Sequence, residues 1–205
     1  MSFLIYLHGF NSSPQSEKAC LTQAFFSGLP KQKKPPKVIV PALPSSPLKA
    51  IEQVKGLVEE LGREELMGFV GSSLGGYYSL YLQHYYSTLT TSHAAKIPKV
   101  VLINPAVKPY ELLEAYIGEN KNIYTGEVYT VEPYHMDDLK SLQVKPIASP
   151  LSTYLLTQTG DEVLAFHEAV DLLRGAKMWI SSGGSHAFEG FSAALPSIES
   201  FLLDA

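Results

Sequence analysis

The feature that most constrains the fold of this 205-residue chain is the stretch from Leu66 to Gly76. Residues 66–70 form a short apolar run that predicts a buried strand, and residues 77–86 predict a helix. Between them, Gly71-Ser72-Ser73-Leu74-Gly75 matches the pattern G-x-S-x-G with Ser73 at its centre. A strand, a sharp turn and a helix are the setting in which this motif presents a nucleophilic serine.

The steric demands of such a turn explain the glycines and select the serine. Because the serine sits in a strained turn, the flanking strand and helix approach closely, and side chains at Gly71 and Gly75 would clash. Ser72 is the rival nucleophile, but the same pattern centred on it requires glycines where Val70 and Leu74 stand. The register therefore favours Ser73, and the alternative is a Gly/Ser-rich turn of purely structural role.

The rest of the chain alternates between predicted strands and predicted helices. We expect strands at residues 3–7, 38–40, 66–70, 100–103, 153–157 and 177–180, and helices at 16–28, 47–61, 74–86, 166–173 and 187–203. This alternation predicts an α/β fold in three layers, with a mostly parallel sheet between helices. Ligands of such sheets bind beyond the carboxyl ends of the strands.

Residues 106–149 interrupt the alternation. The segment is rich in tyrosine and carries three prolines, and two short helices are expected around residues 110–117 and 136–142. Structureless loops of this length are uncommon in compact domains. We therefore expect a cap or lid inserted into a single domain that spans residues 1–205, or, alternatively, a plug that only buries the end of the sheet.

The composition excludes several classes of protein. Hydrophobic residues make up 45% and charged residues 18% of the chain, as in ordinary globular proteins. A net charge of −4 without long charged runs argues against nucleic acid or an anionic membrane as the main partner. The single cysteine, Cys20, allows no intramolecular disulfide and no cysteine metal cluster, and we expect it to be buried. Without a signal peptide or a membrane span, a cytoplasmic protein is expected.

Two side chains at the ends of expected strands could act as the partners of a reactive serine. A serine hydroxyl needs a base to accept its proton, and the base needs an orienting carboxylate. His186 follows the last expected strand in a glycine-rich loop, and Asp161 follows the strand before it. The order serine, aspartate, histidine is the order of the motif's usual partners. The alternatives are a polar loop residue for His186 and a helix N-cap for Asp161.

The other histidines and carboxylates fit these roles less well. His8 precedes the loop glycine after the first expected strand, and His84 lies about three helical turns from Ser73, too far to reach it. The other three lie in a polar stretch (His93), in the insertion (His135) and inside a helix (His167). Glu162 is expected to point elsewhere, and Asp137 and Asp138 lie in the insertion.

Attack on a carbonyl group also needs donors for the negative charge that develops on oxygen. One is expected from the backbone N–H of Leu74, directly after Ser73 at a helix N-terminus. The second is expected from the N–H of Phe10, with Asn11 as the alternative, because Gly9 would let that loop approach a substrate. The predicted substrate-binding residues are His8, Gly9, Asn11, Tyr77 and Asn104.

These segments resemble α/β-hydrolases and, more narrowly, the small bacterial YqiA-like esterase family. The matching segments span nearly the whole chain in the family's order: residues 6–14, 71–78, 104–106, 160–163 and 184–188. The resemblance implies esterase activity on acyl esters, with Ser73 as nucleophile, Asp161 as its acid partner and His186 as base, and without a metal or other cofactor. It also implies six parallel strands in the order 2-1-3-4-5-6, without the first hairpin of larger relatives.

The leading hypothesis is a serine esterase that cleaves a small-molecule acyl ester through an acyl-enzyme. An acyl-CoA thioesterase with the same residues is the nearest alternative, and a basic segment at residues 31–37 could then meet a phosphate, although a solvated loop is the simpler interpretation. A non-catalytic binding protein of the same fold is the rival from another class. A monomer or a homodimer is expected.

Overall fold

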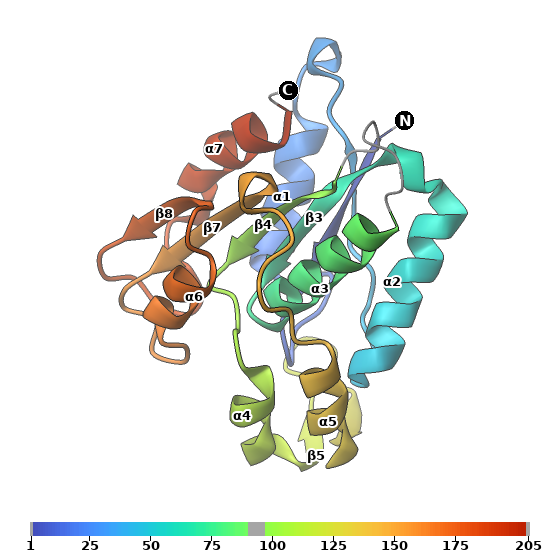
Figure 1. Cartoon of the computed structure of the whole chain (residues 1–205), viewed down its shortest axis with the longest axis vertical. Helices are drawn as coiled ribbons and strands as arrows, with labels where there is room; N and C mark the ends of the chain where they lie inside the picture. Colours follow the sequence, from blue (N-terminus) through green and yellow to red (C-terminus); the bar gives the residue numbers. More distant parts are fainter. Residues whose placement is uncertain (1, 90–96, 204–205) are drawn as a thin grey trace.

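Six parallel strands form the central sheet of the computed structural model, which describes residues 2–89 and 97–203 (Figure 1). They are β1 (Phe3–Leu7), β2 (Lys37–Ile39), β3 (Leu66–Ser72), β4 (Lys99–Ile103), β7 (Thr153–Gln158) and β8 (Lys177–Ser181). Their spatial order is β2-β1-β3-β4-β7-β8, which confirms the predicted sheet. His93 and most of the polar stretch around it lie outside the described residues.

The central strands consist of continuous apolar runs because helices cover both faces of the sheet. Every residue of β1 and β7 is buried. Successive side chains alternate between two cores, so Ile5 and Phe69 pack on one face while Leu4 and Val70 pack on the other.

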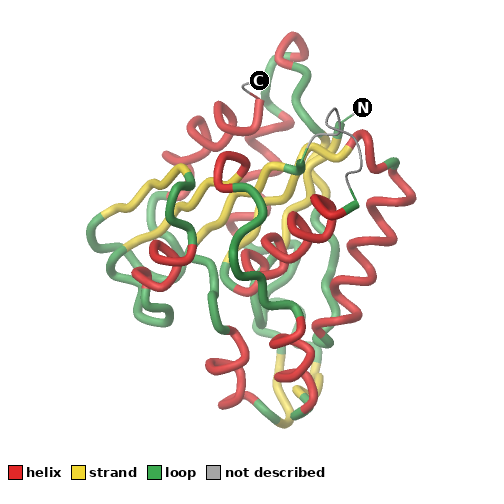
Figure 2. Tube along the Cα trace, viewed as in Figure 1, coloured by secondary structure: helices red, strands yellow, loops and turns green. Residues whose placement is uncertain are grey.

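Helices cover both faces of the sheet, as Figure 2 shows. On one face lie α2 (Pro47–Leu61), α3 (Leu74–Thr88) and α6 (Phe166–Leu172). On the other lie α1 (Glu17–Ser27) and α7 (Phe191–Leu203). Short 3₁₀ turns occupy residues 31–33, 63–65, 114–116 and 150–152. In the described part of the chain, no helix combines the length and the apolar character that crossing a membrane requires.

Two predictions about these helices are wrong. Cys20 is exposed, because α1 buries Ala19, Thr22 and Phe26, and the next residue along a helix points about 100° away from Ala19. The last helix begins at Phe191 and not at residue 187, because Phe188 and Gly190 adopt positive φ angles that a helix excludes.

The segment 106–149, inserted between β4 and β7, contains both predicted helices and one hairpin that the sequence did not predict. The helices are α4 (Pro109–Leu113) and α5 (Tyr134–Ser141), and an antiparallel pair, β5 (Gly118–Lys121) and β6 (Val128–Val131), lies between them. β5 has the sequence GENK and no buried side chain, so it lacks the apolar alternation of a strand. Figure 1 shows α4, β5 and α5 together beyond the carboxyl ends of the sheet strands.

Candidate active site

The turn between β3 and α3 holds Ser73 in a strained conformation. Its backbone angles are φ 54° and ψ −120°, a region that is costly for a residue with a side chain. Four backbone hydrogen bonds fix this geometry: Ser73 N–H donates to Ile103 O at 3.0 Å, and Ser73 O accepts from Gly76 N–H at 3.0 Å, from Ala106 N–H at 3.1 Å and from Tyr77 N–H at 3.4 Å. Strand β4 and the residues after it therefore hold the turn.

The predicted clashes around this turn are confirmed. A Cβ atom on Gly71 would lie 2.2 Å from Gly75 O, and one on Gly75 would lie 1.9 Å from Leu7 O. Only glycine fits at either position, because backbone atoms cannot move aside as the end of a flexible side chain can.

Ser73, His186 and Asp161, which follow three different strands, lie in a continuous chain of contacts. His186 Nε2 lies 3.1 Å from Ser73 Oγ, and His186 Nδ1 lies 2.8 Å from Asp161 Oδ2. A hydroxyl proton can be donated to Nε2 only if the ring proton is on Nδ1, where it is donated to the carboxylate. The imidazole is 23% exposed and the carboxylate 1% exposed, so only the ring meets solvent.

Asp161 is held as a carboxylate by its surroundings. Burial alone would raise its pKa, but hydrogen bonds from His186 and from the N–H groups of Leu164 and Val163 outweigh burial and lower the pKa below its ordinary value. Those two amides donate to Oδ1 at 2.8 and 2.9 Å. The N-cap residue of α6 is Ala165, so Asp161 does not have the alternative capping role.

The loop that carries His186 is fixed by three polar side chains. Asn104 Nδ2 donates to Ser185 O at 3.0 Å and to His186 O at 3.2 Å, and Gln158 Oε1 accepts from Ser185 N–H at 3.1 Å. Glu162 Oε2 accepts the backbone N–H of His186 at 2.9 Å, whereas the ring of His186 contacts Asp161, so Glu162 is not the carboxylate that faces the ring. Gln158 was missed, because a buried glutamine at a strand end belongs to no motif.

Of the predicted substrate-binding residues, the structure brings three to cavities and two to other places. His8, Gly9 and Asn11 line cavities beside Ser73. Asn104 is 1% exposed and faces the His186 loop. Tyr77 donates its hydroxyl to Leu139 O at 2.6 Å and lines neither cavity.

The loop after β1 lies directly against the serine. A Cβ atom on Gly9 would be 3.1 Å from Ser73 Cβ. No hydrogen bond from the backbone N–H of Phe10 or of Leu74 to another described residue is present. These two amide donors, one next to Ser73 in the chain and one in the adjacent loop, are therefore available to a ligand.

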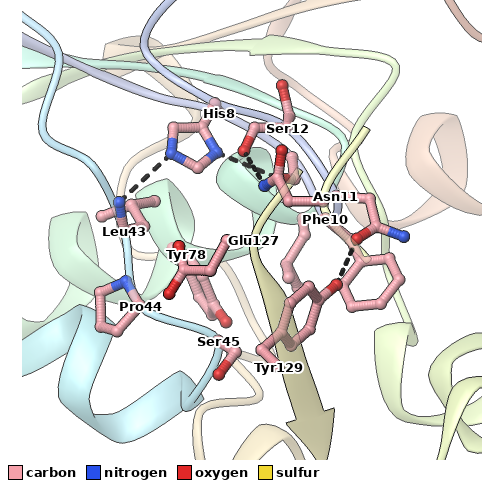
Figure 3. Close-up of a pocket in the computed structure, with 13 residues that line it drawn as sticks. His8, Phe10, Asn11, Ser12, Leu43, Pro44, Ser45, Tyr78, Glu127 and Tyr129 are labelled. Atoms are coloured by element: carbon pink, nitrogen blue, oxygen red, sulfur yellow. Dashed lines mark hydrogen bonds between the residues drawn. The ribbon is translucent and has the colours of Figure 1, made fainter. Parts of the chain in front are cut away.

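His8 fixes one side of this loop. Leu43 N–H donates to His8 Nε2 at 3.2 Å, so that nitrogen carries no proton, and Nδ1 then donates to Gly9 O at 3.0 Å (Figure 3). Burial lowers the pKa of His8, which favours the same neutral ring.

Two cavities flank the loop. The larger, about 360 Å³, is lined by Ser73, His186 and mainly polar side chains, among them Tyr6, Lys18 and Glu162. The smaller, about 110 Å³, is lined by Leu74, Tyr78 and the other residues of Figure 3. Among residues 2–89 and 97–203, no group of three or more His, Cys, Asp or Glu side chains is placed to hold a metal ion.

Solved structures with similar folds cover nearly the whole chain. Est1E from Butyrivibrio proteoclasticus matches 99% of this chain and 87% of its own, with a TM-score of 0.75 and 13% identity. Alpha/beta hydrolase domain-containing protein 10 from mouse matches 96% and 88%, with a TM-score of 0.66 and 15% identity. The monoacylglycerol lipase of Paleococcus ferrophilus matches 98% and 93%, with a TM-score of 0.63 and 18% identity. At these identities the likeness establishes the fold, which is that of the α/β-hydrolases.

A family model supplies the second comparison. The uncharacterised protein family UPF0227 matches residues 3–203, which is almost the entire chain. The resemblance that the sequence motifs indicate is thereby confirmed. The chain belongs to the uncharacterised protein family UPF0227, and it has the α/β-hydrolase fold.

Proposed function

We propose that this protein is a serine hydrolase that cleaves carboxylic esters through an acyl-enzyme. The observation that carries the proposal is the unbroken contact chain from Ser73 Oγ to His186 Nε2, at 3.1 Å, and from His186 Nδ1 to Asp161, at 2.8 Å. Its position beyond the carboxyl ends of a parallel sheet is where ligands of this architecture bind. Solved proteins of the same fold include one named as an esterase domain and one named as a monoacylglycerol lipase.

In the first step, Ser73 Oγ attacks the ester carbonyl carbon while His186 Nε2 takes the hydroxyl proton. Asp161, buried and ionised, stabilises the imidazolium that forms. The carbonyl oxygen becomes negatively charged between the N–H groups of Leu74 and Phe10, which have no other acceptor among the described residues.

In the second step, His186 returns the proton to the ester oxygen as the carbon–oxygen bond breaks, and the alcohol leaves. Because His186 gives its proton to the leaving alcohol, the alcohol half of the ester lies in the larger cavity, which His186 lines. The acyl half then lies in the smaller cavity, which Leu74 lines. Water, deprotonated by His186, then attacks the acyl-enzyme and releases the acid and Ser73.

The position of the basic segment favours an ester over an acyl-CoA. Residues 31–36 precede β2 and Lys37 is its first residue, so the segment lies at the amino ends of the parallel strands, whereas Ser73 follows the carboxyl end of β3. Lys33 is paired with Glu199 of α7 at 2.5 Å. The basic segment and the serine are therefore at opposite edges of the sheet, and the segment does not reach the cavities.

The insertion is the part of the proposed enzyme that closes the site. Asn122, Glu127 and Tyr129 line the smaller cavity, and Ile123 and Tyr124 line the larger one. We assign it the role of a cap within one domain. The cytoplasmic location and the monomeric or homodimeric state stay predictions.

Labelling with a fluorophosphonate tests the proposal. Folded wild-type protein is expected to react at Ser73 and to hydrolyse p-nitrophenyl esters, and Ser73→Ala is expected to do neither while its melting temperature stays nearly unchanged. Absence of labelling in folded wild-type protein would instead support a non-catalytic binding protein of this fold.

A further inference from the structure

Three consecutive residues of the loop after β1 are held by the β5–β6 hairpin. Tyr129, on β6, donates its hydroxyl to Asn11 Oδ1, and Asn122, which follows β5, donates from Nδ2 to Ser12 O at 2.9 Å. The ring of Phe10 stands edge-on to those of Tyr129 and Tyr116, with centroids 6.1 and 5.2 Å away. Figure 3 shows Tyr129, Asn11 and Phe10 together beside the smaller cavity.

The conformation of the loop makes such support necessary. Asn11 has a φ of 52°, a left-handed conformation that costs a non-glycine residue free energy. His8 fixes only the start of the loop, through Leu43 and Gly9. These His8 contacts end at Gly9, so they do not fix the direction of the Phe10 N–H.

The hairpin is itself built to make one of these contacts. Asn122 Oδ1 accepts the N–H groups of Tyr124 and Thr125 at 2.9 and 3.0 Å, which shapes the turn and aims Nδ2 at the loop. One side chain thus forms the turn of the hairpin and ties it to a segment 110 residues earlier in the chain.

We infer that the hairpin positions the oxyanion donor, with Tyr129 and Asn122 as positioning residues for the N–H of Phe10. The inference rests on the proposed function. Preorganised donors act on charge that exists in the transition state and not in the bound substrate. Loosening the hairpin therefore lowers kcat and leaves KM nearly unchanged, whereas a hairpin that only covers bound substrate would affect KM.

Two variants remove the hydrogen bonds and leave the rest of the hairpin in place. Tyr129→Phe keeps the ring against Phe10, and Asn122→Asp keeps the acceptor that shapes the turn. We expect about a fivefold loss of kcat for each and about a thirtyfold loss for the double variant, below the 10²–10³-fold that follows removal of a whole donor. Thr130→Val, which removes an exposed hydroxyl from the next residue of β6, is the matched control and retains wild-type kcat.

A measurement without substrate separates positioning from general damage. Hydrogen–deuterium exchange across residues 8–13 is expected to accelerate in the double variant, while exchange in β3 and β4 stays at the wild-type rate. An unchanged exchange rate in the loop would overturn the inference, as would a rise in KM at constant kcat.

Failure of the inference differs from failure of the proposed function. If wild-type protein reacts with the fluorophosphonate at Ser73 and the double variant retains wild-type kcat, the inference alone is overturned. If folded wild-type protein does not react at all, the proposed function and the inference fall together.

Discussion

The carboxyl edge of the sheet and the 106–149 insertion face the same cavities but are held in different ways. At the sheet edge, Ser73 and Asp161 are fixed by backbone hydrogen bonds and buried neighbours. In the insertion, β5 has no buried side chain, and the hairpin reaches the loop after β1 through Tyr129 and Asn122. In the proposed enzyme, the sheet edge supplies the reacting groups, and the insertion aims the Phe10 donor and limits which substrates fit.

The largest effect is expected at the sheet edge, from Asp161→Asn. The amide cannot stabilise the imidazolium and favours the wrong tautomer of His186, so kcat should fall by about 10⁴-fold with little change in folding. Asp171→Asn, at an exposed aspartate on α6, is the control and should retain full activity. Comparable activity in the two variants would remove Asp161 from the mechanism.

Alanine substitutions at two glycines should change the stability in opposite directions, and this difference tests how tightly the sheet edge is packed. Gly75→Ala places a Cβ atom 1.9 Å from Leu7 O and should cost about 3 kcal/mol or more, or abolish folding. Gly56→Ala, in α2 with open space around it, should stabilise the protein by about 0.5–1 kcal/mol. Urea unfolding measures both, and a stable Gly75→Ala variant would show that the turn between β3 and α3 is loosely packed.

The smaller cavity lies where the two regions meet, and in the proposed enzyme it holds the acyl group. Its 110 Å³ is less than the roughly 150 Å³ that accommodates benzene, so short acyl chains should be preferred. Leu43→Ala enlarges the cavity and should raise kcat/KM for an eight-carbon ester relative to a two-carbon ester by about tenfold. Leu61→Ala, at the exposed end of α2, is the control, and equal preferences in the two variants would place the acyl group elsewhere.

The smallest effect concerns His8 and the pH dependence of stability. Because burial lowers the pKa of His8, the unfolded chain binds a proton more readily than the folded one, and stability falls as pH drops below the ordinary histidine pKa of about 6.5. His8→Gln should reduce the loss of melting temperature between pH 7 and pH 5, whereas His167→Gln, at an exposed site, should not. An unchanged slope in His8→Gln would show that His8 is not held neutral.

The sequence predicts the sheet edge far better than the insertion, for a physical reason. Buried parallel strands need continuous apolar runs, and the turn at Ser73 needs glycines on both sides, so β1, β3, β4 and the position of Ser73 follow from residue type. Contacts such as those of Asn104 with the His186 loop depend on distant segments and leave no local pattern.

The hairpin is the part of the insertion that the sequence does not predict. β5 has one exposed face and no apolar side chain, and it is held by pairing with β6 and by the hydrogen bond from Asn120 Nδ2 to Tyr116 O. Its tyrosines marked the segment as unusual, but only the structure shows that Tyr129 and Asn122 reach the loop of Phe10.

Trapping of the acyl-enzyme tests the central claim most directly. Wild-type protein mixed with a short p-nitrophenyl ester, quenched in acid within the first turnover and digested, should carry one acyl group on the peptide that contains Ser73. The Ser73→Ala variant should carry none and show no turnover. Turnover by wild-type protein without any acyl group on Ser73, or turnover by Ser73→Ala at the wild-type rate, would contradict the account.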